Sequence, residues 1–125
     1  MDLIKQIEYW RSSSVEDLEA ARSLLEKGHF RHSLFFAHLA MEKMLKALVV
    51  RQTKTVPPKI HNLERLAELA GIRLSPEQKK FFAEFEAYQL IGRYPDAAKA
   101  RIDPQTARKD FSAAEEKLKW LKSLL

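Results

Sequence analysis

The sequence predicts an all-α protein, a four- to five-helix up-and-down bundle. Apolar residues recur every three or four positions through long stretches, which is the spacing that buries one face of a helix. Only three glycines occur, and the prolines fall between or at the start of the periodic stretches. No stretch shows the alternation of apolar and polar residues typical of a half-buried strand. Long helices with short connections therefore favour a bundle.

The first helix is expected from about residue 2 to residue 27, because one apolar seam continues through it in register. Ser14 and Asp17 form a capping-box pattern that could divide this helix. The uninterrupted seam favours one continuous helix. Gly28 then supplies the residue that commonly ends a helix.

The second helix is expected at residues 30–52. Pro57-Pro58 marks the loop that follows it. Proline lacks an N–H donor and disfavours helix at the residue before it, so the helix has to end before this point. A short third helix is expected at residues 61–70, ending at Gly71. We expect this helix to connect the longer ones, which pack antiparallel.

The last two helices each begin with a recognisable cap. Ser75-Pro76-Glu77-Gln78 combines an N-cap serine, a proline in the first turn and a capping-box glutamine, and this helix is expected to continue to about Leu90. Asp103-Pro104 begins the final helix in the same manner. The predicted core consists of Trp10, Leu18, Leu25, Phe35, Leu39, Leu45, Leu48, Phe81, Phe85, Phe111, Leu118 and Leu121.

Composition limits the class of protein. The chain has 125 residues, of which 46% are hydrophobic, so we expect residues 1–125 to form one domain with a real core. Its apolar runs are too short to span a bilayer, and its first residues have neither signal- nor transit-peptide character. The absence of cysteine excludes disulfides. We expect a cytoplasmic protein. The net charge of +5 is compatible with a phosphate-bearing partner.

The second helix carries charges where an apolar surface is expected. His38, Glu42 and Lys46 follow one another at intervals of four residues and form a narrow polar stripe with apolar residues on both flanks. A helix that is apolar nearly all round is normally central, so these charges must be paired or directed into a pocket. One interpretation is an ion pair between Glu42 and Lys46. The other is a ligand site.

The loop between the last two helices is the second unusual feature. It offers Arg93, Tyr94, Asp96, Lys99 and Arg101, a rich set of hydrogen-bond donors with one carboxylate. Loops of about a dozen residues are uncommon in compact bundles and are frequently functional. The alternative is that Arg93 pairs with Asp96 while Tyr94 packs over the end of the bundle.

Other chemistry is not indicated. The four histidines show no zinc-binding pattern, and there is no glycine-rich phosphate loop or nucleophile elbow. We therefore expect no metal and no cofactor. A helix-turn-helix interpretation would place residues 76–90 in the major groove, but this segment is apolar and acidic, which disfavours sequence-specific DNA binding.

Five short segments follow one another along the chain: Trp10, Gly28-His29-Phe30, residues 37–47, residues 57–63 and Arg93-Tyr94-Pro95-Asp96. With these segments in this order, the chain resembles the HEPN family (higher eukaryote and prokaryote nucleotide-binding domain) from about Trp10 to Leu121. This resemblance implies a helical bundle that usually dimerises and is related to the substrate-binding subunits of nucleotidyltransferases. Such proteins are often encoded beside a minimal nucleotidyltransferase, with which they can form a toxin–antitoxin pair.

Many members of this family are metal-independent ribonucleases that carry an arginine followed, after four to six residues, by a histidine. Arg93 stands where the motif arginine is expected, but His61 is the last histidine of the chain. Other matches to this spacing lie on the wrong helices. Since imidazole is the natural acid and base near neutral pH, the usual site is incomplete. Asp96, Tyr94 or a folded-in His61 would have to replace it.

Three functions remain open. The first is a non-catalytic module that binds nucleotide or RNA phosphate and works with a nucleotidyltransferase. The second is a ribonuclease toxin with an altered site, and the third is a structural dimerisation or adaptor protein. A homodimer is expected, since the second helix has more apolar circumference than one bundle core needs. The predicted ligand site consists of Arg93, Tyr94, Asp96, Lys46, Glu42 and His61, with no catalytic residue assigned.

Overall fold

The computed structural model describes residues 2–94 and 101–125, and this part of the chain contains helices and no strand. The all-α prediction is confirmed. The helices are α1 (Leu3–Glu26), α2 (Phe30–Thr53), α3 (Leu63–Leu69), α4 (Pro76–Phe85), α5 (Ala87–Arg93) and α6 (Pro104–Ser123).

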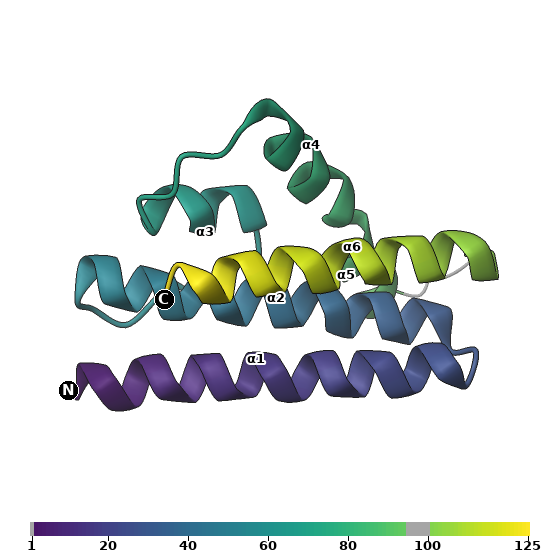
Figure 1. The fold of residues 1–125 in the computed structure, drawn as a ribbon, viewed down its shortest axis with the longest axis horizontal. Coiled ribbons are helices and arrows are strands. Elements are labelled where there is room, and N and C mark those ends of the chain that lie inside the picture. The colour runs from purple at the N-terminus through teal and green to yellow at the C-terminus, as the bar shows by residue number, and fades with distance from the viewer. Residues whose placement is uncertain (1, 95–100) are drawn as a thin grey trace.

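The three long helices α1, α2 and α6 lie side by side (Figure 1). α1 and α2 are antiparallel, and α6 runs in the same direction as α2, so the two ends of the chain lie at the same end of the molecule. α3 and α4 lie above this layer, and α5 packs against α2. No described helix is both long and apolar enough to cross a membrane.

Local signals set most helix boundaries as predicted. α1 continues through its serines as one helix. Ser75 and Gln78 form the predicted capping box at α4, and the Asp103 side chain caps α6. Gly28 and Gly71 follow α1 and α3 with φ of 82° and 74°, a backbone conformation that glycine adopts without steric cost.

The helix predicted from Ser75 to about Leu90 is wrong in one respect, because the structure divides it at Glu86 into α4 and α5. Gln89 N–H donates to the Glu86 carbonyl three residues earlier, so the chain tightens at this point. The Glu86 side chain meanwhile accepts the backbone N–H of Leu63. α4 is consequently inclined to the long helices and is not the antiparallel bundle helix that we expected (Figure 1).

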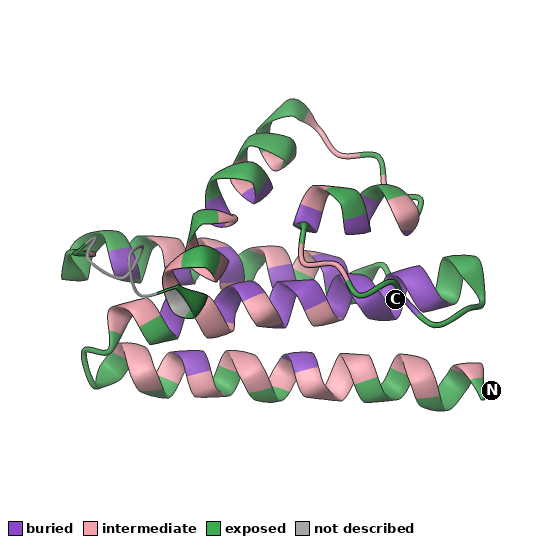
Figure 2. Ribbon diagram, turned by 180° about the vertical axis from the view of Figure 1, so that it is seen from behind, coloured by how far each residue is buried: buried purple, intermediate pink, exposed green. Residues whose placement is uncertain are grey.

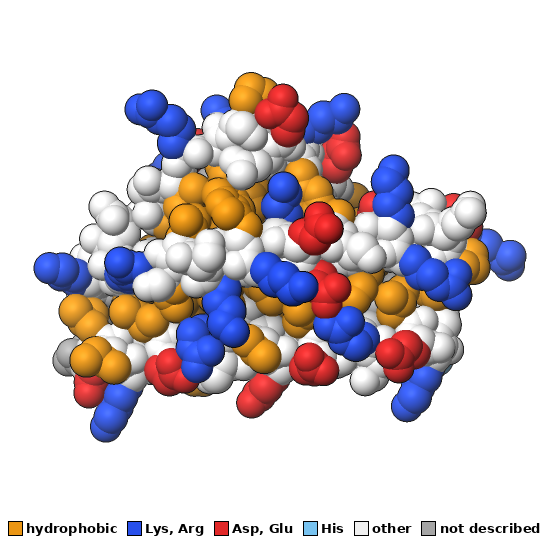
Figure 3. All heavy atoms as spheres, in the orientation of Figure 1, with side chains coloured by type: hydrophobic (Ala, Val, Ile, Leu, Met, Phe, Trp, Pro, Cys, Tyr) orange, Lys and Arg blue, Asp and Glu red, His pale blue; other side chains and the backbone are white. Residues whose placement is uncertain are grey.

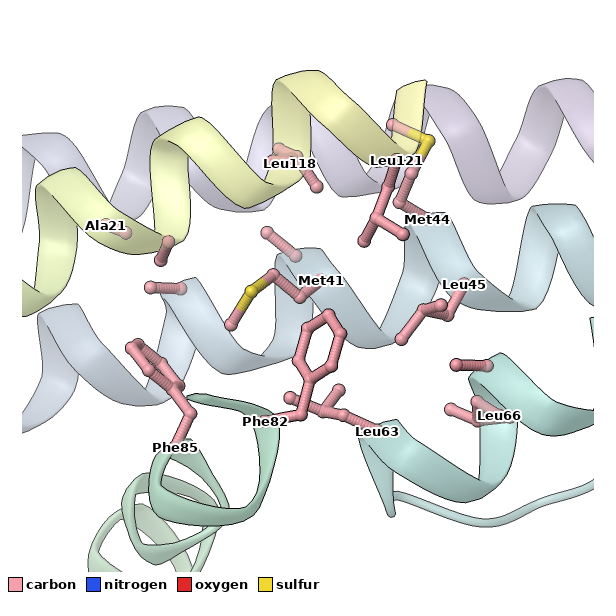
Figure 4. Close-up of a cluster of buried hydrophobic side chains, with 14 of the residues drawn as sticks. Ala21, Met41, Met44, Leu45, Leu63, Leu66, Phe82, Phe85, Leu118 and Leu121 are labelled. Atoms are coloured by element: carbon pink, nitrogen blue, oxygen red, sulfur yellow. The ribbon is translucent and has the colours of Figure 1, made fainter. Parts of the chain in front are cut away.

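α2 is the central helix, and buried positions follow it along most of its length (Figure 2). Around Met41 and Leu45, the core is completed by side chains from the upper helices and from α6 (Figure 4). Six of the predicted core residues are buried: Leu45, Leu48, Phe85, Phe111, Leu118 and Leu121.

The other half of the predicted core is only half-buried. α1 packs mainly against α2 and less against α6, so part of its surface is open, as the exposed side chains of Ile4 and Tyr9 indicate. Small and unbranched residues, notably Ala37, Met41 and Met44, fill the centre of the bundle instead. The half-buried members of the prediction are Trp10, Leu18, Leu25, Phe35, Leu39 and Phe81.

Candidate functional site

Glu42 is the centre of a buried polar cluster on α2. Its side chain is 4% exposed, and its Oε2 atom lies 3.1 Å from the Lys46 ammonium one helical turn away. The Nδ1 atom of His61 lies 3.1 Å from each carboxylate oxygen. His61 comes from the segment immediately before α3, so the cluster joins two parts of the chain. One buried carboxylate thus holds two nitrogen groups.

His38 extends the cluster by one turn towards the start of α2. Its ring is 1% exposed, with Nδ1 3.9 Å from Glu42 Oε1 and Nε2 3.4 Å from Glu86 Oε1. The same Glu86 oxygen accepts the Leu63 N–H at 2.7 Å. Glu86 therefore connects α2, the start of α3 and the junction of α4 with α5.

The charge of this cluster depends on its two histidines. Glu42 and Glu86 contribute two negative charges and Lys46 one positive charge, so the sum is −1 when both histidines are neutral. Protonation of both His38 and His61 would bring it to +1. Buried charges need such compensation, because removing them from water costs several kcal/mol per ion, on the order of the stability of the whole domain.

Lys46 has a second partner on α1. Its ammonium lies 5.4 Å from the centroid of the Trp10 ring, within the range of a cation–π interaction. Lys46 is therefore enclosed between the Glu42 carboxylate and an aromatic face. This arrangement fits the ion-pair interpretation of the polar stripe.

Arg93 is predicted in the loop, but the structure has it at the last position of α5, where it is exposed and lies over α2. Its guanidinium carbon is 5.3 Å from the centroid of the Phe35 ring, and its Nε donates to Gln89 Oε1 at 3.1 Å. Phe35 and Glu42 are seven residues apart, so they lie on one face of α2, about two turns from each other. Arg93 thus lies along the face that carries the polar cluster. Its described contacts are with Phe35 and Gln89 and not with the cluster.

Tyr94 and Asp96 are the other predicted site residues from this loop. Tyr94 ends α5 and is 58% exposed. Asp96 lies outside the described residues, so its place in the ligand site stays a prediction. Of the six predicted site residues, the structure brings Lys46 and His61 into direct contact with Glu42.

Sequence reasoning missed Glu86 and Trp10 as neighbours of this cluster. Glu86 is one of several acidic residues on the predicted fourth helix, and Trp10 belongs to the apolar seam of the first. Neither position carries a local signal for its role. Within residues 2–94 and 101–125, no three or more acidic or histidine side chains are arranged to hold a metal ion.

The fold and the cluster define a helical bundle whose central helix buries a histidine-linked carboxylate. The family model of the HEPN domain matches residues 7–124, and the chain belongs to this family. Family membership indicates a nucleotide- or RNA-related function. Searches of the curated proteins and of the solved structures found no match.

Proposed function

We propose that the protein is a helical module that binds the phosphate groups of a nucleotide or RNA through Arg93 and His61. The observation that carries this proposal is the position of both side chains along one face of α2. Arg93 is exposed, and the His61 side chain is 43% exposed above a buried carboxylate. Two cationic or protonatable groups on one accessible face suit an extended phosphate ligand.

The guanidinium of Arg93 is suited to this role. Its Nε is occupied by Gln89, while its two Nη groups donate no hydrogen bond within the described part of the chain. Guanidinium is planar and always charged, and paired N–H groups match the oxygens of a phosphate. The Phe35 ring beneath it supports the side chain without neutralising it.

Glu42 and Lys46 would then act from beneath the side chains that contact the phosphate groups. Glu42 holds His61 by Nδ1, so the opposite ring nitrogen, Nε2, is directed away from that carboxylate. Lys46 compensates the Glu42 charge from inside the bundle. We assign the phosphate contacts to Arg93 and His61 and the positioning of the imidazole to Glu42. Tyr94 and Asp96 remain proposed members of the site through their place next to Arg93.

A metal-independent ribonuclease is the second candidate, and the contact between His61 and Glu42 favours it. A carboxylate that accepts from Nδ1–H fixes the neutral tautomer, in which Nε2 is able to accept a proton. This arrangement would supply the imidazole that is missing after Arg93. His61 would serve as the general base and Arg93 would stabilise the developing charge on phosphate.

The assembly remains part of the proposal. Leu39 is half-buried on the central helix, and we propose that it enters a homodimer interface beside the phosphate site. We further propose one domain over residues 1–125, action in the cytoplasm and partnership with a minimal nucleotidyltransferase in a toxin–antitoxin pair. The mass in solution by light scattering at micromolar concentration tests the dimer, and a monomeric mass would refute it.

Binding of a short RNA and of ATP, measured across a salt series, tests the phosphate site. Arg93→Ala should weaken binding and reduce the salt dependence, because one phosphate contact is lost. Arg73→Ala, which removes an exposed arginine between α3 and α4, is the matched control. Equal binding by wild type and Arg93→Ala would remove Arg93 from the site.

The same preparations distinguish the two candidates. RNA incubated with wild type, Arg93→Ala and His61→Gln without added metal is resolved on a denaturing gel. Cleavage by wild type that both variants lose would favour the ribonuclease. Intact RNA together with Arg93-dependent binding would favour the binding module.

A further inference from the structure

A small pocket lies between α4, α5 and α6. It has a volume of about 210 Å³ and is lined by aromatic and acidic side chains. Figure 3 shows the face of the molecule on which hydrophobic side chains remain visible between α6 and the helices above it. The residues that line the pocket are Phe81, Glu84, Phe85, Tyr88 and Asp110.

Three aromatic rings form one side of this pocket. The centroids of Phe81 and Phe85 are 5.3 Å apart with the planes tilted by 39°. Phe85 and Tyr88 meet edge to face at 4.8 Å. The break at Glu86 separates Tyr88 from the two phenylalanines, but the ring contacts hold the three side chains together. The face of an aromatic ring is electron-rich, and such a cluster attracts positive charge.

Two carboxylates add negative charge to the pocket. The Tyr88 hydroxyl donates to Asp110 on α6, and burial together with this carboxylate raises the pKa of Tyr88. Tyr88 therefore stays neutral and leaves the charge on Asp110. Glu84 stands on α4 with its side chain 68% exposed and only a 4.0 Å contact with Lys80.

A cation already rests against one of these rings. The Lys117 ammonium of α6 lies 5.5 Å from the Phe81 centroid, so this ring already takes part in a cation–π interaction. Lys117 does not line the pocket itself.

From these contacts we infer that the pocket is a binding site for an organic cation, a guanidinium or alkylammonium group. Aromatic rings and carboxylates together recognise such a group, whereas a metal ion would need more oxygen ligands and an anion would be repelled. The volume is below the roughly 300–1,000 Å³ of ordinary ligand pockets, so it admits a head group rather than a whole metabolite. This site is independent of the proposed phosphate site. The group could come from a protein side chain or from a free amine.

NMR titration of the full chain tests the inference. The probes are tetramethylammonium chloride and N-acetyl-arginine amide, with N-acetyl-alanine amide and sodium chloride as controls. We expect saturable shifts of the Phe81 and Tyr88 ring protons in the millimolar range for at least one cation. Tighter binding of the arginine derivative would indicate a protein side chain as the source, and tighter binding of tetramethylammonium a free amine.

Glu84→Gln is the decisive variant, because the exposed side chain at this position can change without loss of the fold. It should weaken the binding of the cation by roughly fivefold, the upper end of what an exposed ion pair contributes. Asp110→Asn should weaken it as well. Glu116→Gln, an exposed carboxylate elsewhere on α6, is the matched control. Shifts that do not saturate, or equal affinities of Glu84→Gln and the control, would overturn the proposal.

Discussion

Replacing Glu42 by glutamine should destabilise the fold strongly, because it leaves a buried lysine without its compensating charge. The Lys46 side chain is 8% exposed, and its ammonium lies 3.1 Å from the Glu42 carboxylate. At this distance the Coulomb attraction is about 5 kcal/mol for an effective dielectric constant of about 20. The glutamine amide is uncharged and cannot replace this attraction. His61 would lose its carboxylate partner at the same time.

The expected cost is about 3–5 kcal/mol, the range for removing one partner of a buried pair. For a domain of this size the corresponding fall in the midpoint of thermal unfolding is on the order of 10–20 °C. Urea unfolding followed by circular dichroism measures the free energy directly. Glu68→Gln is the matched control, because Glu68 pairs with Arg65 on α3 with both side chains well exposed. That variant should change little, since exposed ion pairs contribute little.

A double-mutant cycle separates the ion pair from other effects of the substitution. Lys46→Met removes the other partner, and the double variant removes both charges. If the charges interact as the structure indicates, the double variant should be more stable than the sum of the two single costs predicts. Two results would refute this reasoning: unfolding free-energy costs that add up in the double variant, or a cost of Glu42→Gln no larger than that of Glu68→Gln. Either result would mean that water screens the charges of the cluster.

Three further predictions concern stability, and each is measured by unfolding of the variant beside wild type. Leu45→Ala should cost about 2–5 kcal/mol, because removal of this fully buried side chain leaves a cavity beneath α3. A cost of about 0.5 kcal/mol or less, the usual size of a surface change, would mean that α2 is not central. Ser14→Ala should cost about 1 kcal/mol, because the buried Ser14 hydroxyl donates to the Ala40 carbonyl at 2.5 Å; an unchanged midpoint would contradict this. Burial and Asp110 raise the pKa of Tyr88 above its ordinary value of 10.0, so the folded state keeps the phenol proton and the associated stability is complete below pH 10. It is lost as the pH rises above that value, and Tyr88→Phe should therefore lose less stability than wild type between pH 9 and pH 11.

The helices could be predicted from sequence wherever a local signal marks them. Ser75, Asp103 and the two glycines at helix ends act on backbone groups within a few residues, so their effect is readable without the fold. The division of the fourth predicted helix at Glu86 could not be predicted. It accompanies a side-chain hydrogen bond to Leu63, which is 23 residues away in sequence.

The candidate site shows the same limit. Contact between Glu42 and Lys46 follows from helical spacing alone. His61 is 19 residues from Glu42, and no periodicity relates them. The family resemblance, and not residue spacing, includes His61 in the predicted site. The aromatic pocket gave no signal, because Phe81 and Phe85 at helical spacing indicate only a core.

The bond between His61 and Glu42 makes the two candidate functions depend on pH in opposite directions. In the neutral ring, Nδ1–H donates to Glu42 and Nε2 can only accept, so it cannot donate to a phosphate oxygen. Phosphate binding through His61 therefore requires the protonated ring and should strengthen as the pH falls. A general base requires the neutral ring, so a cleavage rate that depends on His61 as the base should decrease as the pH falls. Because Glu42 holds the ring in either state, the direction of the pH dependence, compared with that of His61→Gln, identifies which chemistry the imidazole performs.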